Sequence, residues 1–314
     1  MSEVAKTFGI GDATVTKIEE LTLNVFTSDA LFPGSDPSLM QRHSDKFDAR
    51  SVDLQSQNVI LSVHSWLVQT PDHTILIDTS TGNDKQRPYA PVFDQLNGPY
   101  LDRLAAAGVL PEAVDYVLLT HLHADHVGWN TRLVGGQWTP TFPNAKYIFS
   151  MVEQNYNESL AEERAPVGGI PDPALGPAVG KPWPLVYDDS VKPVIEAGLA
   201  QMIALGGEGV GQGVLDGFSF IPTPGHSVDH ASIRFISRGE EALFSGDLMH
   251  HPLQVYETGL HSCFCEFPEA ALRSRQWGLE HAAEHNALYF STHFGGSSAG
   301  RISRKGDRFE WQFA

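Results

Sequence analysis

The sequence lacks several features that would point to other classes of protein. It has only two cysteines, Cys263 and Cys265, which are too few and too close together for the disulfide framework of a small secreted domain. No apolar run approaches the length of a bilayer-spanning helix, and residues 1–6 contain no apolar signal core. We therefore expect no membrane partner and a cytoplasmic location.

Basic residues are also scarce. Lys and Arg number 21 against 38 Asp and Glu, which gives a formal net charge of −17. A groove that follows a phosphate backbone needs clustered Lys and Arg. The nearest approach to a cluster, at residues 301–308, is better interpreted as a solvated end of the chain. The composition thus excludes nucleic acid as an expected partner and favours a small neutral molecule.

The length sets the scale of the fold. With 314 residues, 41% of them hydrophobic, the chain can bury one large core, so residues 1–314 are expected to form a single domain. Residues 1–55 are interpreted as an N-terminal extension. Residues 165–185 are rich in Pro and Gly, and are expected to form an insertion that caps the active site or contacts a second subunit in a homodimer.

One short run carries a dense set of metal-binding side chains. His121, His123, Asp125 and His126 follow the apolar residues 117–119 within a few positions. Imidazole and carboxylate are ligands that zinc and neighbouring divalent metals accept. Alternation places His121 and His123 on one side of an extended strand end, and Asp125 and His126 can face a second ion as the chain turns. The run predicts a two-metal site rather than a histidine-rich surface loop.

Three later segments supply further ligands, each after an apolar strand and a few small residues. Residues 218–221 lead to His226, residues 242–244 to Asp247, and residues 287–290 to His293. Open α/β sheets build their sites at the carboxyl ends of strands, where distant segments converge. Asp247 is the natural bridging ligand, because one carboxylate has two oxygens.

Together these residues resemble the metallo-β-lactamase superfamily from residue 64 to the C-terminus. The resemblance implies an α/β fold, a four-layer αββα sandwich with the site along one edge of its two sheets. It also implies a role for each ligand. His121, His123 and His226 would hold the first metal, Asp125, His126 and His293 the second, and Asp247 would lie between them. Asp78 would orient a ligand histidine from behind.

The resemblance implies a hydrolase with two zinc ions, for which manganese, iron or cobalt could substitute. A metal-bridging hydroxide would attack a small neutral ester, lactone or phosphotriester, with Asp125 and Asp247 as the catalytic carboxylates. The sequence has no G-x-S-x-G motif to offer a serine nucleophile. True β-lactamases typically lack the aspartate found at position 247, and redox di-iron relatives place Glu at position 123. The lactonase and organophosphate-hydrolase branch fits best.

Three alternatives remain open. A glyoxalase-II-type thioesterase shares the seven ligands, but glutathione recognition requires basic residues that the sequence does not identify. A mono-iron sulfur dioxygenase would use fewer ligands. A non-catalytic metal-binding regulatory protein would keep the fold, although the intact ligand set argues against lost activity.

Cys263 and Cys265 are expected to be inert thiols rather than additional metal ligands.

Neighbours of the ligands are candidates for substrate contact. Trp129 and Asn130 follow the metal run, Met249 and His251 follow Asp247, and Phe294 follows His293. Among these, His251 is expected to supply a hydrogen bond to the substrate or leaving group. His230, which lies close to His226 in the sequence, is expected to support the ligands.

The remaining pattern predicts ordinary elements around the site. Strands are expected at residues 15–26 and 147–149, and a hairpin at 62–78. Helices are expected at residues 101–107, 152–164 and 269–285.

Overall fold

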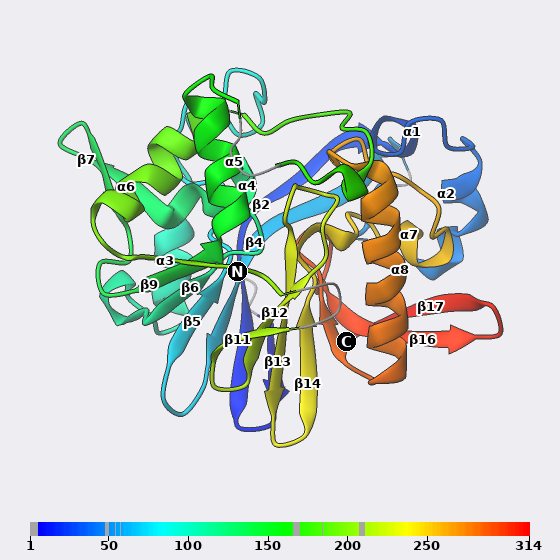
Figure 1. Ribbon diagram of the computed structural model, residues 1–314. Helices are drawn as coiled ribbons and strands as arrows, with labels where there is room; N and C mark the ends of the chain where they lie inside the picture. The colour runs from blue at the N-terminus through cyan, green and yellow to red at the C-terminus, as the bar shows by residue number, and fades with distance from the viewer. Residues whose placement is uncertain are drawn as a thin grey trace. The chain divides into compact units, whose positions relative to one another are not determined.

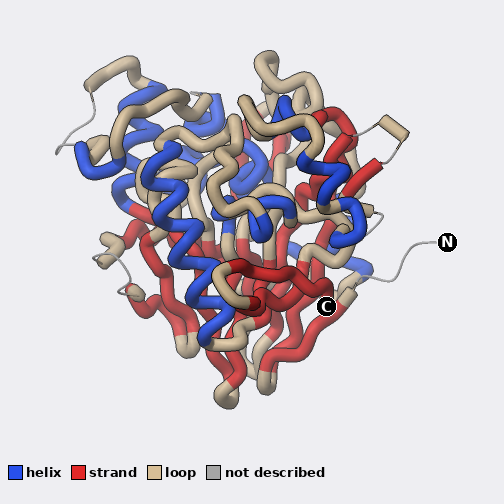
Figure 2. The backbone as a smooth tube through the Cα atoms, turned by 90° about the vertical axis from the view of Figure 1, so that its right-hand side faces the viewer, coloured by secondary structure: helices blue, strands red, loops and turns tan. Residues whose placement is uncertain are grey.

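Two units share the chain in the computed structural model, which describes residues 6–47, 50–53, 55–56, 58–165, 170–183, 185–206 and 211–314 (Figure 1). Unit 1 consists of Met1–Glu20, Val63–Pro171 and Pro182–Leu205. Unit 2 consists of Leu21–Ser62, Asp172–Lys181 and Gly206–Ala314. The chain forms an eight-stranded sheet, most of whose strands lie in unit 1, and a seven-stranded sheet in unit 2. Figure 2 colours the strands red and the helices blue.

The sheet of unit 1 has the strand order β1-β2-β4-β5-β6-β9-β10, with β3 beside β4. Strands β2 and β4 begin in one unit and end in the other, and β3 belongs to unit 2. The strands are β1 Thr7–Ile10, β2 Ala13–Thr27, β3 Val52–Asp53, β4 Asn58–Gln69, β5 Thr74–Ile77, β6 Tyr116–Leu118, β9 Lys146–Ser150 and β10 Ala200–Ile203.

Parallel pairing in this sheet sets where the first cluster forms. β5 pairs with β6, and β6 with β9, in the register Ile77–Leu118–Ile148. The carboxyl ends of these strands therefore lie at one edge, where Asp78 and the run after β6 both emerge.

Helices pack on this sheet through one apolar cluster. It joins Tyr100 and Leu104 of α3 and Val194 of α6 to Val117 and Tyr147 of the strands. Ser150 begins α5 by accepting the main-chain N–H groups of Val152 and Glu153. The helical segments are α3 Tyr100–Ala106, η2 Pro111–Ala113, α4 Ala124–Val127, η3 Gly128–Asn130, α5 Met151–Ala161, the π-helix η5 Tyr187–Val191 and α6 Lys192–Glu196, and a hairpin joins β7 Thr131–Val134 to β8 Gln137–Pro140.

Unit 2 is built on a seven-stranded sheet in the order β11 to β17. All of its pairs are antiparallel except β14 with β15. β12, β14 and β15 therefore run in the same direction, and their carboxyl ends share one edge. The strands are β11 Gln212–Leu215, β12 Phe218–Pro222, β13 Ala231–Ser237, β14 Glu240–Phe244, β15 Leu288–Phe290, β16 Ala299–Lys305 and β17 Arg308–Phe313.

The long helix α8 lies against this sheet. Its Leu279 and Ala282 pack with Tyr289 of β15 and Ile302 of β16. A second apolar cluster unites the extension with α7 through Leu31, Val59 and Leu253. The helical segments are α1 Ser28–Leu31, α2 Leu39–Arg42, η1 Ser44–Lys46, η4 Pro173–Leu175, η6 Gly246–Leu248, α7 Leu253–Tyr256 and α8 Pro268–Glu284.

Part of the Pro/Gly-rich insertion belongs to unit 2. Residues 166–169 and 184 lie outside the described residues, whereas Asp172–Lys181 is described and packs beside α8. The main-chain N–H of Val179 donates to the carbonyl of Glu266 at 2.8 Å. Arg273 donates to the carbonyl of Ala174 at 2.7 Å. This stretch is therefore tied to the start of α8.

The elements predicted from the sequence are present, with different boundaries. The predicted hairpin, the strands and the helices correspond to β4–β5, β2, β9, α3, α5 and α8. α5 ends at Ala161, three residues before the predicted end. β6 ends at Leu118, so His121 and His123 lie on a loop rather than on a strand end. No described helix has both the length and the apolar content that crossing a bilayer requires.

Candidate metal centre

The first cluster belongs to unit 1 and follows β6. The ring centroids of His121 and His123 are 4.5 Å apart, and those of His121 and His126 are 4.0 Å apart. Oδ1 of Asp125 lies 3.8 Å from Nε2 of His126. The four ligands predicted from this run are thus gathered by one loop and the single turn of α4, which begins after His123.

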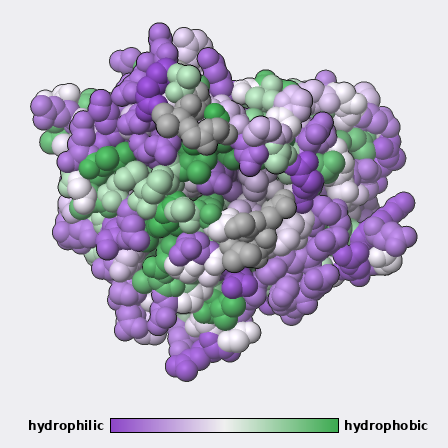
Figure 3. Space-filling model, in the orientation of Figure 1, coloured by the Kyte–Doolittle hydropathy of each residue, from purple (hydrophilic) through white to green (hydrophobic). Residues whose placement is uncertain are grey.

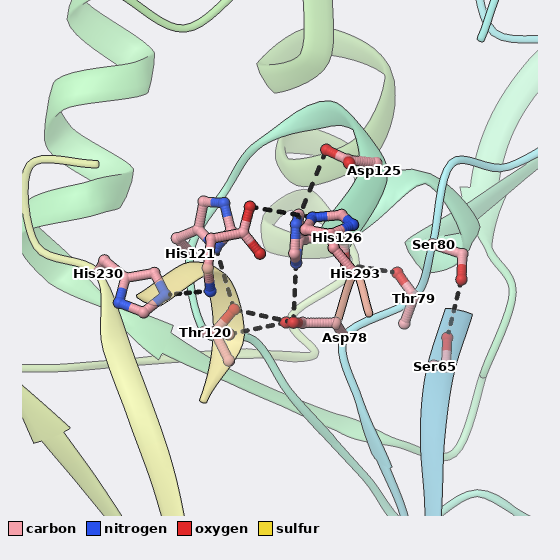
Figure 4. A network of polar contacts seen from close by, with 12 residues as sticks. Ser65, Asp78, Thr79, Ser80, Thr120, His121, Asp125, His126, His230 and His293 are labelled. Atoms are coloured by element: carbon pink, nitrogen blue, oxygen red, sulfur yellow. Dashed lines mark hydrogen bonds and ion pairs between the residues drawn. The ribbon is translucent and has the colours of Figure 1, made fainter. Parts of the chain in front are cut away.

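Asp78 anchors this cluster from behind (Figure 4). One carboxylate oxygen accepts the main-chain N–H of Thr120 at 2.8 Å. The other accepts the Thr120 hydroxyl at 2.8 Å and lies 2.9 Å from Nδ1 of His126. Asp78 is buried, and its backbone has a φ of 55° at the end of β5. The predicted supporting position of Asp78 behind a histidine therefore has a direct geometric basis.

These contacts fix which ring nitrogen carries the lone pair. Because a carboxylate can only accept, His126 is protonated on Nδ1, and Nε2 carries the lone pair. The Thr120 hydroxyl gives its hydrogen to Asp78, so its oxygen accepts from Nδ1 of His121 at 3.0 Å. Both rings therefore have the tautomer that a metal ligand of the Nε2 type requires.

Gly128 lets the loop pack closely behind the cluster. A Cβ atom at this position would lie 1.7 Å from the carbonyl oxygen of Thr81. The main-chain N–H of Gly128 donates to the carbonyl of Ser80 at 2.7 Å. Any side chain at position 128 would push the metal-binding loop away from the segment that follows β5.

The second cluster belongs to unit 2 and converges on Asp247. His226 follows β12, Asp247 follows β14 and His293 follows β15, so the shared sheet edge brings them together. Oδ2 of Asp247 lies 3.1 Å from Nε2 of His226 and 3.1 Å from Nε2 of His293. All three side chains are buried. The three strand ends thus bring these side chains together within unit 2.

Neutral groups orient this second cluster. Nδ1 of His293 lies 3.0 Å from the carbonyl of Ser62, so it donates and Nε2 carries the lone pair. Nε2 of His230 accepts the main-chain N–H of Asp247 at 2.9 Å. Nδ1 of His230 then carries the hydrogen and faces the carbonyl of Thr223 at 3.0 Å. His230 thus holds the backbone of Asp247, a supporting position like the one predicted for it.

Gly225 places His226 against α8. Its φ is +130°, a conformation that L residues rarely adopt, and a Cβ atom would lie 2.0 Å from the main-chain nitrogen of Ala271. The carbonyl of Gly225 accepts from Phe267 at 2.8 Å, and the carbonyl of His226 accepts from Glu266 at 3.0 Å. The histidine therefore sits directly on the beginning of the helix.

His250 is a member of this cluster that the sequence interpretation did not select. Its Nε2 lies 3.3 Å from Oδ2 of Asp247, and its ring stacks on His293 with centroids 5.3 Å apart. With His226 and Asp247 it forms a group whose geometry could hold a metal ion. Burial lowers the pKa of His250, which favours a neutral ring. The feature of the sequence that could have indicated His250 is its position three residues after Asp247.

His251, by contrast, is hydrogen-bonded to the main chain. Its Nε2 lies 3.0 Å from the carbonyl of Ser51, and its Nδ1 accepts the N–H of Leu253 at 3.1 Å. Burial lowers its pKa to about 4. Both ring nitrogens are therefore engaged, which argues against the predicted substrate contact and leaves His250 as the better-placed neighbour.

The other predicted substrate contacts lie in the interior. Met249 and Phe294 belong to the apolar cluster under α8. Trp129 stacks on Tyr100 with centroids 5.2 Å apart and donates to Glu20 at 2.5 Å. Asn130 accepts from the hydroxyl of Thr79 at 2.9 Å. Packing and internal hydrogen bonds account for the positions of all four side chains.

The cysteines are both reduced thiols. Cys263 is exposed and Cys265 is buried. Sγ of Cys265 lies 3.9 Å from Nδ1 of His226, and burial raises the pKa of this thiol to about 12. A thiol with so high a pKa stays protonated at neutral pH and is a poor metal ligand.

The donor chemistry of both clusters fits divalent metal ions. Each offers imidazole and carboxylate groups, the set that zinc accepts. In each, acceptors behind the rings select the tautomer with the lone pair on Nε2. The buried histidines and aspartates thus have the arrangement of ligands rather than of solvated surface groups.

Comparison with known proteins identifies the family. Residues 59–293 match the metallo-beta-lactamase superfamily. The chain therefore belongs to this superfamily. The predicted α/β metallo-β-lactamase fold and the predicted class, a metallo-hydrolase of that superfamily, are both confirmed.

Individual relatives of known sequence have low identity to this chain. The N-acyl homoserine lactonase AiiB of Agrobacterium fabrum is 32% identical over 85 residues, which cover 24% of this chain and 31% of AiiB. The match thus spans less than a third of that protein. YobT of Bacillus subtilis, an uncharacterized protein, is 26% identical over 229 residues, covering 71% of this chain and 77% of YobT.

Solved structures extend the likeness over the whole chain. The hydrolase AbOPH has a TM-score of 0.76 at 23% identity, covering 100% of this chain and 99% of its own. The dizinc quorum-quenching lactonase AidC has a TM-score of 0.73 at 19% identity, covering 99% and 97%. At these identities the structures establish the fold.

Proposed function

We propose that the protein is a dinuclear zinc hydrolase that cleaves a small neutral ester, lactone or phosphotriester. The observation that carries the proposal is the tautomer selection in both clusters, where His126 is backed by Asp78 and His293 by the carbonyl of Ser62. Such backing contacts accompany metal-ligating histidines and increase the basicity of the ring. A surface histidine cluster has no need of them.

The ligand assignment in this proposal combines the two clusters. Unit 1 would supply His121, His123, Asp125 and His126, and unit 2 would supply His226, Asp247 and His293. Support comes from the donor set of each cluster and from the superfamily to which the chain belongs. When bound, the two ions would lower the pKa of a shared water and polarise the oxygen of the substrate's reacting group.

The chain's own residues would then do the following. Asp78 and His230 would hold a ligand ring and a ligand backbone in place. His250 would donate to Oδ2 of Asp247, at the 3.3 Å separation, and so restrain its orientation. Asp125, which is half-buried, would carry a proton to the leaving group.

A neutral substrate is favoured by charge and by relationship. The net charge of −17 repels polyanions. Figure 3 shows hydrophilic side chains over much of the visible face, with apolar patches between them. The similarity to AiiB, named as an N-acyl homoserine lactonase, favours a lactone within this class.

Metal content and turnover test the proposal together. Zinc-loaded protein should contain about two ions per chain and hydrolyse a lactone, an aryl ester or a phosphotriester in preference to a glutathione thioester. Asp247→Ala should lose both ions and reduce kcat/KM roughly 1,000-fold, as expected for removal of several kcal/mol of stabilisation. His293→Ala should chiefly lose one ion.

His285→Ala, on the exposed end of α8, is the matched control and should keep both ions. One ion per chain would contradict the dinuclear site. Efficient hydrolysis of the thioester alone would move the protein to the thioesterase class. Salt-sensitive cleavage of an oligonucleotide would refute the neutral-substrate assignment.

A further inference from the structure

We propose that Phe264 is a specificity-determining residue, which binds the aliphatic acyl or alkyl chain of the substrate. The inference rests on the proposed function. It concerns the aliphatic chain of the substrate, which the metal ligands cannot recognise. Phe264 lies between α7 and α8 in unit 2, and the residue is 39% exposed. Its neighbours Cys265 and Phe267 are buried, at 2% and 1%. Phe264 thus presents one large apolar ring to solvent next to the exposed Cys263 and just before a buried stretch of the chain.

The ring lies beside the Asp247 cluster. Its centroid is 5.5 Å from that of His250, at an interplanar angle of 40°. Nε2 of His250 is in turn 3.3 Å from Oδ2 of Asp247. A single side chain therefore separates the exposed ring from the carboxylate that we place between the metals. A substrate held at that carboxylate would have its apolar portion within reach of Phe264.

The ring is also held from behind by the N-terminal extension. Phe26 contacts it edge-on, with centroids 5.5 Å apart and an interplanar angle of 86°. The main-chain N–H of Cys263 donates to the carbonyl of Leu31 at 2.9 Å. Leu31 is fully buried in the cluster that unites the extension with α7. These contacts fix the segment against the extension while part of the apolar surface of Phe264 stays in water.

The chemistry of this position selects the class of ligand. Rigid aromatic rings bind apolar groups at a low cost in conformational entropy. The acidic composition disfavours an anionic substituent. Methylene groups covered by the ring leave water, and each buried one can strengthen binding by up to about fourfold. We therefore expect affinity to rise with the length of an aliphatic chain.

Kinetics on a series of γ-lactones with increasing alkyl chains test this inference. For the zinc-loaded wild type, KM should fall as the chain lengthens from γ-valerolactone to γ-decalactone. In Phe264→Ala the dependence should flatten, with a loss in kcat/KM of about threefold or less for the shortest lactone and about thirtyfold or more for the longest. Phe264→Leu, which keeps an apolar side chain, should lie between the two.

Ile236→Ala is the matched control. Ile236 is 40% exposed, but it lies near the far end of β13, roughly 17 Å along the strand from Ala231 beside His230. This variant should keep the wild-type dependence on chain length. The Phe264 variants and Ile236→Ala should all retain the metal content of the wild type, because neither Phe264 nor Ile236 carries a metal-binding atom.

A binding measurement separates this inference from the proposed function. Calorimetric titration of zinc-loaded protein with butanoate, octanoate and decanoate needs no turnover. The affinity should increase along the series in the wild type and much less so in Phe264→Ala, with Phe264→Leu between the two. The same dependence in all three proteins would overturn the role of Phe264. Absence of hydrolysis with chain-length-dependent binding intact would instead overturn the proposed reaction.

Discussion

The two clusters differ in how the chain assembles them. In unit 1, all four predicted ligands come from six consecutive residues after β6. In unit 2, the ligands come from three separate strand ends, and only the direction of β12, β14 and β15 brings them together. The first cluster is therefore a property of local sequence, whereas the second depends on a correctly formed sheet.

The two units also differ in their buried polar interactions. In unit 1 these involve charges: Asp78 backs His126, and elsewhere in the unit Arg87 makes a bidentate contact with Asp189 at 2.6 and 2.9 Å. Unit 2 uses main-chain carbonyls, such as that of Ser62 behind His293. Its buried Arg275 donates to the carbonyls of three residues, namely Leu248, Thr258 and Leu260. We infer that unit 1 is sensitive to the loss of a charge and unit 2 to the loss of backbone geometry.

The largest expected effect tests the charged bracing of unit 1. Asp189→Ala would leave the fully buried Arg87 and Lys85 without the carboxylate that faces both. Breaking a buried ion pair on one side typically costs about 3–5 kcal/mol, so urea unfolding should show a loss of that order. Asp188→Ala, at the exposed neighbouring position, is the control and should change stability little. Equal losses in the two variants would contradict the special role of the pair.

The next largest effect concerns the pH dependence of stability that His251 gives to unit 2. Burial lowers the pKa of His251 to about 4, below its ordinary value near 6.5. Between these values the unfolded state binds more protons than the folded state, so stability falls as the pH drops through this window. The loss should approach about 3 kcal/mol near pH 4, where the folded ring begins to titrate.

Urea unfolding of the wild type and of His251→Gln at several pH values measures this term. The stability advantage of the wild type should shrink as the pH falls from 6.5 to 4. Leu110→Gln, at an exposed position, removes no titratable group and should keep a constant difference from the wild type. A pH-independent advantage of His251 would mean that its ring is not held neutral.

The smallest effect compares the residues behind the ligands. Asp78→Asn removes the carboxylate that fixes the tautomer of His126, so one zinc ion should bind about 10- to 100-fold more weakly. His230→Gln should have less effect, because His230 holds a main-chain N–H of Asp247 rather than a ligand ring. Competition with a chromophoric chelator measures both affinities. A stronger effect of His230→Gln would reverse the proposed ranking of the two supports.

Local sequence predicted the first cluster well because spacing alone identifies it. His121, His123, Asp125 and His126 needed no knowledge of the sheet. His226, Asp247 and His293 could be selected because each follows an apolar strand, but only strand direction shows that they meet. His250 and His251 are adjacent and identical in type, so sequence could not tell which ring faces Asp247 and which meets the carbonyl of Ser51.

Phe264 shows the same limit for substrate recognition. Nothing in its local sequence distinguishes it from the buried Phe267 three residues later. Its surroundings include Phe26 and Leu31 of the extension, more than 230 residues away in the chain. The elements themselves were easier to predict, because period-two and helical patterns of apolar residues are local.

The seating of His226 on α8 has a consequence for how the protein opens. The amide hydrogens of Glu266, Phe267 and Val179 form a relay that runs from the carbonyls of His226 and Gly225 to the insertion. They should be released to solvent together when residues 266–267, just before α8, detach from these carbonyls. An ion bound at His226 would oppose that detachment by mass action. Hydrogen exchange at these three amides should therefore report occupancy of the metal centre, although none of them contacts the ion.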